Sequence, residues 1–154
     1  MLRDEINTAL RVAMKARDER RVSTLRLVNA AIKNADIEAE TGRKSAPSDD
    51  DLLALLQKLV KQRQESVEIY DTAGRRELAD KERGEIEIIR AFLPRQMSED
   101  ESKAAIADVI KATGASSIRD MGKVMAALKH SHAGKMDFGK ASGVVKALLS
   151  ASGG

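Results

Sequence analysis

Basic side chains are concentrated near the end of this 154-residue chain, where two short amphipathic helices are expected. Six basic and only two acidic residues lie between Ile118 and Lys146. Lysine acts as a point charge on phosphate oxygens, and arginine binds two such oxygens at once. The pattern therefore predicts a surface that faces a polyanion. The six candidate phosphate-binding residues are Arg119, Lys123, Lys129, Lys135, Lys140 and Lys146.

The first of these two helices is expected to run from Ile118 to about His130. In such a helix Arg119, Lys123 and His130 share one face, because spacings of four and seven residues return to the same side. Taken alone, this row is also explained as an ordinary solvated face. Gly122 inside the helix indicates a close approach of backbone, either to a packed helix or to a phosphate. The expected buried positions are Ile118, Met121, Val124 or Met125, and Leu128.

Composition excludes several other kinds of site. The chain has no cysteine, which removes disulfides, thiol catalysis and thiolate zinc sites, and its two histidines form no metal-ligand pattern. Neither a nucleophile elbow nor a phosphate-binding glycine loop is present. We therefore expect no metal, no cofactor and no catalytic residue. No segment approaches the ~20 apolar residues of a membrane span, and no signal region is visible, which favours a cytoplasmic protein without membrane contact.

Several sequence boxes carry a family resemblance. The M-G-K-V-M box at Met121–Met125 follows G-A-S-S and precedes G-K-M-D. Together they resemble the tail domain of the GatB component of aspartyl/glutamyl-tRNA amidotransferase. The chain as a whole resembles the free-standing relatives of that tail, the GatB/YqeY-domain family. Its further matching boxes are S-T-L-R-L-V-N-A-A-I-K-N-A-D-I-E (Ser23–Glu38), L-Q-K-L-V-K-Q-R-Q-E-S (Leu56–Ser66), A-G-R (Ala73–Arg75) and F-L-P-R-Q (Phe92–Gln96).

The resemblance implies a tRNA-associated module without catalytic activity of its own. In the larger enzyme the tail docks on the elbow side of tRNA, which makes the basic residues the implied contacts. Relatives often show K-G-[KR]-A-D-[GP] where this chain has A-G-K-M-D-F, so Lys135 is the remaining contact in that loop. The alternatives are a protein-interaction adaptor for tRNA-charging or amidotransferase proteins, and an accessory component of such an enzyme. Carbon–nitrogen ligase activity with glutamine as amido-N-donor would be inherited by similarity and would need the other enzyme components.

Apolar residues recur with helical spacing throughout, and no alternating strand pattern stands out, so an all-α fold is predicted. We expect a four-helix N-terminal domain at residues 1–96 and a three-helix tail-like domain at residues 97–154. Ser48, Ser98 and Asp137 are expected to cap helix starts, and Gly42, Gly74 and Gly114 to end helices. The fourth helix has a thin apolar stripe (Leu78, Ile86, Ile89, Leu93) and is predicted to be a solvated strut. Arg17, Arg20, Arg21 and Arg26 are expected to form salt bridges within the bundle.

Overall fold

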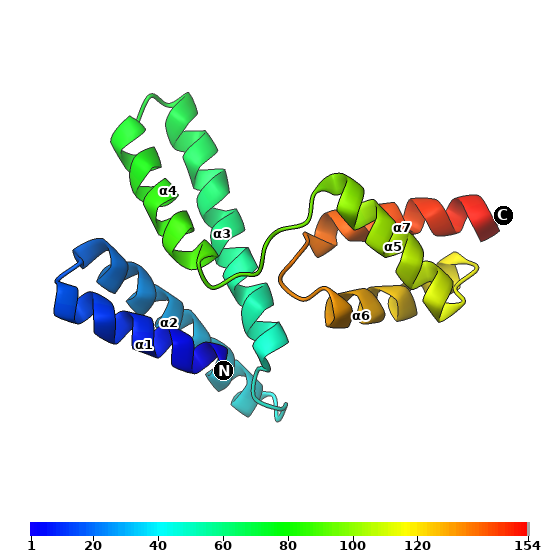
Figure 1. The fold of residues 1–154 in the computed structure, drawn as a ribbon, viewed down its shortest axis with the longest axis horizontal. Coiled ribbons are helices and arrows are strands. Elements are labelled where there is room, and N and C mark those ends of the chain that lie inside the picture. The colour runs from blue at the N-terminus through cyan, green and yellow to red at the C-terminus, as the bar shows by residue number, and fades with distance from the viewer. Residues whose placement is uncertain (154) are drawn as a thin grey trace. The chain divides into compact units, whose positions relative to one another are not determined.

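All regular secondary structure in the computed structural model is helical, and residues 1–153, the part that the structure describes, contain no strand (Figure 1). This confirms the all-α prediction. The chain divides into two compact units, Met1–Pro94 and Arg95–Gly154. Each unit has its own cluster of buried apolar side chains.

The first unit consists of two helical hairpins (Figure 1). Helices α1 (Leu2–Ala16) and α2 (Glu19–Thr41) form one, and α3 (Asp49–Thr72) and α4 (Arg76–Arg90) form the other. Helix α2 packs against α4 as well as α1. Apolar residues at helical spacing on all four helices meet in one core. The core residues are Leu2, Ile6, Ala13, Leu25, Val28, Ile32, Leu52, Leu56, Val60, Ile86, Ile88 and Ile89.

Most helix ends lie where the sequence predicts them and are marked by the expected capping residues. Ser48 begins α3 with a capping box, in which its hydroxyl accepts the N–H of Asp51 and Asp51 accepts the N–H of Ser48. Gly74 follows α3 with a φ of 71°. Helix α2 ends at Thr41 with Gly42 as its C-cap, as predicted. Gly42 has a φ of −79°, and it is the next residue, Arg43, that takes the left-handed conformation with a φ of 53°.

The turn between α1 and α2 is tight and rich in arginine. Arg17 follows α1 in the left-handed conformation with a φ of 55°, and Asp18 caps α2 by accepting the N–H of Arg21 at 3.2 Å. The salt bridges expected for Arg17, Arg20, Arg21 and Arg26 are absent from the described part of the chain. The prediction was wrong because Asp18 is turned onto the backbone N–H of Arg21, and no carboxylate of the described residues forms an ion pair with these arginines.

Helix α4 is not the solvated strut that its sequence predicts. Its buried residues are Ala79, Glu85, Ile86, Ile88 and Ile89, so a full face is covered by neighbouring helices. The error arises from Glu85, whose charge interrupts the apolar pattern although its side chain is only 10% exposed. Arg63 on α3 donates to the Glu85 carboxylate at 2.8 Å, and this pair lets a charge lie inside the hairpin. Leu78, expected to be buried, is 38% exposed.

The second unit contains α5 (Glu99–Thr113), the 3₁₀ turn η1 (Ile118–Asp120), α6 (Met121–Ser131) and α7 (Phe138–Gly153). Ser98 opens α5 with the predicted capping box. Gly114 ends the helix, as predicted, and does so in the left-handed conformation with a φ of 69°. The three helices enclose a small core. Its buried residues are Ile106, Val124, Leu128, Met136, Ala141, Val145 and Leu149.

Breaking the buried ion pair is predicted to destabilise the first unit. In Arg63→Met the Glu85 carboxylate keeps its buried position without a partner, which should lower the free energy of unfolding by about 3 kcal/mol. The double variant Arg63→Met, Glu85→Leu should recover to within about 1 kcal/mol of the wild type. Urea unfolding measures both. As a control, Arg83→Met removes two exposed ion pairs, with Asp71 and Asp80, and should lose less than about 1 kcal/mol. A single Arg63 variant as stable as the control would contradict the prediction.

The cap of α5 predicts a pH-dependent contribution to stability. The Arg95 guanidinium, together with the Ser98 backbone amide, lowers the pKa of Glu101 to about 2. Because the folded pKa lies below the ordinary value of 4.5, this contribution is present above pH 4.5 and is lost as the pH falls toward 2. A carboxyl titration by NMR should place Glu101 near the lower value, and Arg95→Gln should move it upward. Titration of Glu101 near its ordinary value in the wild type would refute the interaction.

Candidate nucleic-acid interface

All six predicted phosphate-binding residues lie in the second unit and are exposed. None of them forms a salt bridge or a side-chain hydrogen bond among the residues that the structure describes. Their side chains therefore remain available to an external anion. Arg119 lies in η1, Lys123 and Lys129 in α6, Lys135 in the loop after α6, and Lys140 and Lys146 in α7.

The expected row of Arg119, Lys123 and His130 is only partly formed. Residues Ile118–Asp120 make a 3₁₀ turn and α6 begins at Met121, so one α-helical repeat does not connect Arg119 to Lys123. Lys123 and His130, seven residues apart within α6, do share a face. Ile118, predicted to be buried, is 48% exposed because it precedes the helix.

The exposed faces of α6 and α7 each have lysines on two flanks. Lys123 and Lys129 are six residues apart, as are Lys140 and Lys146. Six residues leave two side chains about 120° apart around a helix. The positive charge is consequently spread over a broad surface and does not form one ridge.

Gly122 lies beside open space, contrary to the expectation of a close backbone approach. A Cβ placed at Gly122 would meet no atom within 4 Å. The same is true of Gly143 on α7. Neither glycine is required by helix packing inside this unit.

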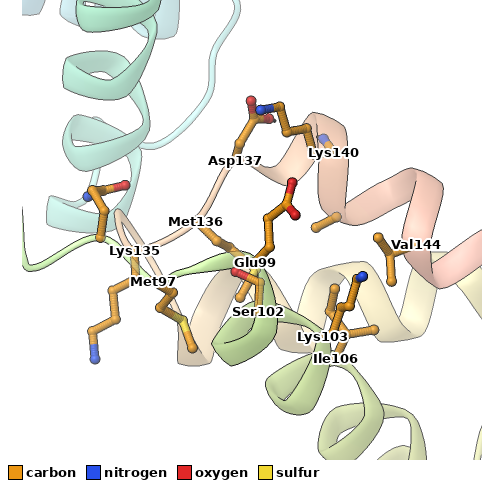
Figure 2. A pocket seen from close by; sticks show the side chains of 12 residues that line it. Met97, Glu99, Ser102, Lys103, Ile106, Lys135, Met136, Asp137, Lys140 and Val144 are labelled. Carbon is orange, nitrogen blue, oxygen red and sulfur yellow. Dashed lines mark hydrogen bonds between the residues drawn. The ribbon is translucent and has the colours of Figure 1, made fainter.

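A hollow of about 310 Å³ brings together three lysines of the second unit. Its apolar lining includes Met97, Ile106 and Val144. Lys103, Lys135 and Lys140 come to it from α5, from the loop and from α7, and Figure 2 shows the side chain of Lys135 pointing away from the other two. The sequence alone did not indicate Lys103, because residues 97–117 are net negative and only the fold brings α5 beside α7. The carboxylates of Glu99 and Asp137 also line the hollow.

Two hydrogen bonds to backbone carbonyl oxygens hold the loop that carries Lys135 in place. The N–H of Met97 donates to the carbonyl oxygen of Lys135 at 2.9 Å, and the side-chain amide of Gln96 donates to the carbonyl oxygen of Gly134 at 2.7 Å. Gly134 is buried and has a φ of 73°, which glycine adopts without strain. The segment before α5 and the loop before α7 are thereby tied together, which sets the positions of Lys135 and Lys140.

The two acidic residues of the basic stretch are turned toward backbone amides. Asp137 accepts the N–H groups of Gly139 and Lys140 at 2.9 Å and 3.2 Å, which confirms its predicted capping role. Asp120 accepts the N–H of Ser116 at 2.9 Å, and this bond is the main cause of its lowered pKa. Lys123 contributes to the same shift by its charge. Both carboxylates thus satisfy N–H groups at the start of a helix or turn.

The described residues contain no group of three or more His, Asp or Glu side chains placed to hold a metal ion. None of the described helices is both long enough and apolar enough to cross a membrane.

Comparison with known proteins identifies one family and several relatives. A model of the YqeY-like protein family matches residues 3–149. An uncharacterized protein of Schizosaccharomyces pombe is 34% identical over 86 residues, which cover 56% of this chain and 67% of that protein. The protein named "Altered inheritance of mitochondria protein 41, mitochondrial" is 35% identical in Eremothecium gossypii and 36% identical in Lachancea thermotolerans. Each of these two matches covers 54% of this chain.

The matched stretch spans less than half of those two longer relatives, 44% of the first and 43% of the second. The family match, in contrast, takes in both units of the structure and nearly every residue of the chain. By sequence and by the extent of that match, the chain belongs to the YqeY-like protein family.

Proposed function

We propose that this protein is a non-catalytic tRNA-associated module that binds the phosphates of tRNA through basic residues of its second unit. The observation that supports it is the set of six exposed basic side chains between Ile118 and Lys146 that lack ion-pair partners among the described residues. Surface lysines and arginines are commonly paired or diluted by acidic neighbours. Here the two acidic neighbours are engaged by backbone amides.

The geometry favours recognition by shape and charge. Lysines on two flanks of α6 and of α7 can meet phosphates on a curved, double-stranded surface, where each contributes a point charge. The hollow adds Lys103 from α5 to Lys135 and Lys140. Double-stranded RNA is read mainly through its shape and backbone, which suits a surface of this kind.

The resemblance to the amidotransferase tail supports tRNA as the nucleic acid. No catalytic step belongs to the proposal: glutamine-dependent amide transfer would need the other components of such an enzyme. The purified chain alone should give no product in a transamidation assay with glutamine and misacylated tRNA.

A cytoplasmic location stays a prediction, and the mitochondrial names of two relatives make cell fractionation the direct test.

A protein-interaction adaptor is the second candidate, and one observation favours it. Ile69 near the end of α3 is 67% exposed and Leu78 at the start of α4 is 38% exposed, so apolar side chains face solvent on both sides of the Gly74 turn. Exposed apolar groups at a hairpin tip suit a protein partner. A pull-down from nuclease-treated lysate separates the two functions: partners that survive the treatment favour the adaptor, and partners that are lost favour RNA.

Charge reversal in the second unit is predicted to weaken tRNA binding. Arg119→Glu, Lys123→Glu should lower the affinity at least tenfold, because two phosphate contacts become repulsive, and the fall of affinity with salt should become shallower. Binding is measured across about 50–300 mM salt. Circular dichroism checks that helicity is retained.

The matched control is Lys33→Glu, Lys58→Glu, two exposed helical lysines of the first unit. It changes the net charge by the same amount and should leave the affinity within about twofold, since the effect is local. Equal losses in both double variants, or wild-type binding that does not change with salt, would overturn the proposed function.

A further inference from the structure

Positive charge in the first unit is concentrated at one place. Residues 11–26 contain six basic and two acidic side chains, whereas the rest of Met1–Pro94 contains twelve basic and sixteen acidic ones. The unit is neutral as a whole but strongly polarised. The basic stretch covers the end of α1, the turn at Arg17 and the start of α2.

The basic side chains of this stretch face solvent without ion-pair partners. Arg11, Lys15, Arg17, Arg20, Arg21 and Arg26 are all exposed, and none of them makes a salt bridge in the described part of the chain. Arg11 donates only to the hydroxyl of Thr8, at 3.2 Å. The Asp18 carboxylate faces the backbone N–H of Arg21. Six positive and two negative side chains in residues 11–26 leave a local excess of four positive charges at the turn.

The structure accommodates these arginines in two specific ways. Arg17 occupies a left-handed conformation that glycine adopts more readily. Arg20 lies directly on α4: a Cβ at Gly84 would be 2.5 Å from Nη1 and 3.0 Å from Cδ of Arg20. Glycine is unfavourable inside a helix, and at this position its missing side chain leaves the space that Arg20 fills. The arginine is thus held across a neighbouring helix while its guanidinium remains without a carboxylate partner.

We propose that the turn between α1 and α2 is a second phosphate-binding surface for RNA, with Arg17, Arg20 and Arg21 as donors. Five of the six basic residues around the turn are arginines, whereas five of the six between Ile118 and Lys146 are lysines. A guanidinium donates two parallel hydrogen bonds to one phosphate, so a fixed arginine orients a backbone that a lysine only attracts. This inference rests on the proposed function for its ligand class and is tested separately from it.

The same arginines would also meet phosphates at a membrane surface, but the neighbouring apolar residues do not support that partner. Val12 and Met14 are 58% and 49% exposed. Being two residues apart in α1, they project about 160° apart around the helix and form no common face. A helix that lies in a membrane interface needs a continuous apolar face. RNA is the partner that the turn fits.

The test uses the full chain with Arg17→Gly, Arg21→Gln and unfractionated tRNA as the probe. Glycine suits the left-handed position, so the variant removes charge without adding strain at that residue. The matched control is Arg43→Gly, Lys44→Gln: Arg43 has a φ of 53°, against 55° for Arg17, and both Arg43 and Lys44 are exposed. The variant at the turn should bind tRNA about tenfold more weakly, and the slope of log affinity against log salt should fall by about 2. The control should stay within about twofold.

Each outcome separates this inference from the proposed function. If the turn variant binds like the wild type while Arg119→Glu, Lys123→Glu weakens binding, the inference is overturned and the proposed function stands. If only the turn variant weakens binding, the inference stands and the second-unit surface fails. Failure of the wild-type chain to bind tRNA overturns both. Vesicles of equal parts phosphatidylcholine and phosphatidylserine are the last arm: loss of vesicle binding with unchanged tRNA binding would assign the turn to membranes and overturn the inference.

Discussion

Backbone N–H groups at helix starts hold most of the acidic side chains that lie near the basic surfaces, and the exposed positive charge of both units depends on this. The first N–H groups of a helix have no partner within the helix and need an acceptor. Asp18 and Asp137 supply one at the starts of α2 and α7, and Asp120 accepts the N–H of Ser116 just before the 3₁₀ turn. A carboxylate fixed in this way satisfies the backbone and stays in place. The lysines and arginines nearby are then left to solvent, even though the overall charge of the chain is only +3.

The exposed basic side chains beside these fixed carboxylates differ between the two units. At the turn between α1 and α2 the cations are mainly arginines, and one of them is seated against Gly84. In the second unit they are mainly lysines on the flanks of α6 and α7. Arginine forms directional, bidentate contacts, while lysine adds charge with little geometric demand. A nucleic acid that met both kinds of surface would be oriented by one and attracted by the other.

Local sequence signals predicted much of the fold because helix ends are local. A hydroxyl or carboxylate three residues before a helical amide identified the starts at Ser48, Ser98 and Asp137. The left-handed glycines at Gly74 and Gly114 were equally visible. These features depend on residues within one turn of one another, so one sequence is enough to find them.

The main errors concern contacts between distant segments or a change of helix type. Arg63 and Glu85 are 22 residues apart, and nothing local shows that the carboxylate of Glu85 is buried. Lys103 joins the basic surface only because α5 and α7 pack together. The 3₁₀ turn before α6 shifts Arg119 and Ile118 away from the positions that a continuous helix would give them. The sequence therefore indicated which basic residues belong to the candidate site, but it indicated their arrangement in space only in part.

The aromatic residues of the chain bear on what kind of recognition the basic surfaces can support. The chain has only three, and Phe92 and Phe138 are drawn into the two cores while Tyr70 is half-buried. Sequence-tolerant binding of single strands relies on exposed aromatic rings that stack on bases. With two of its three rings packed against the cores and its basic side chains exposed, this fold presents positive charge to an anion and few rings for stacking. Under the proposed function, selectivity among nucleic acids would come from the spacing of phosphates, which a folded RNA fixes and a flexible single strand does not.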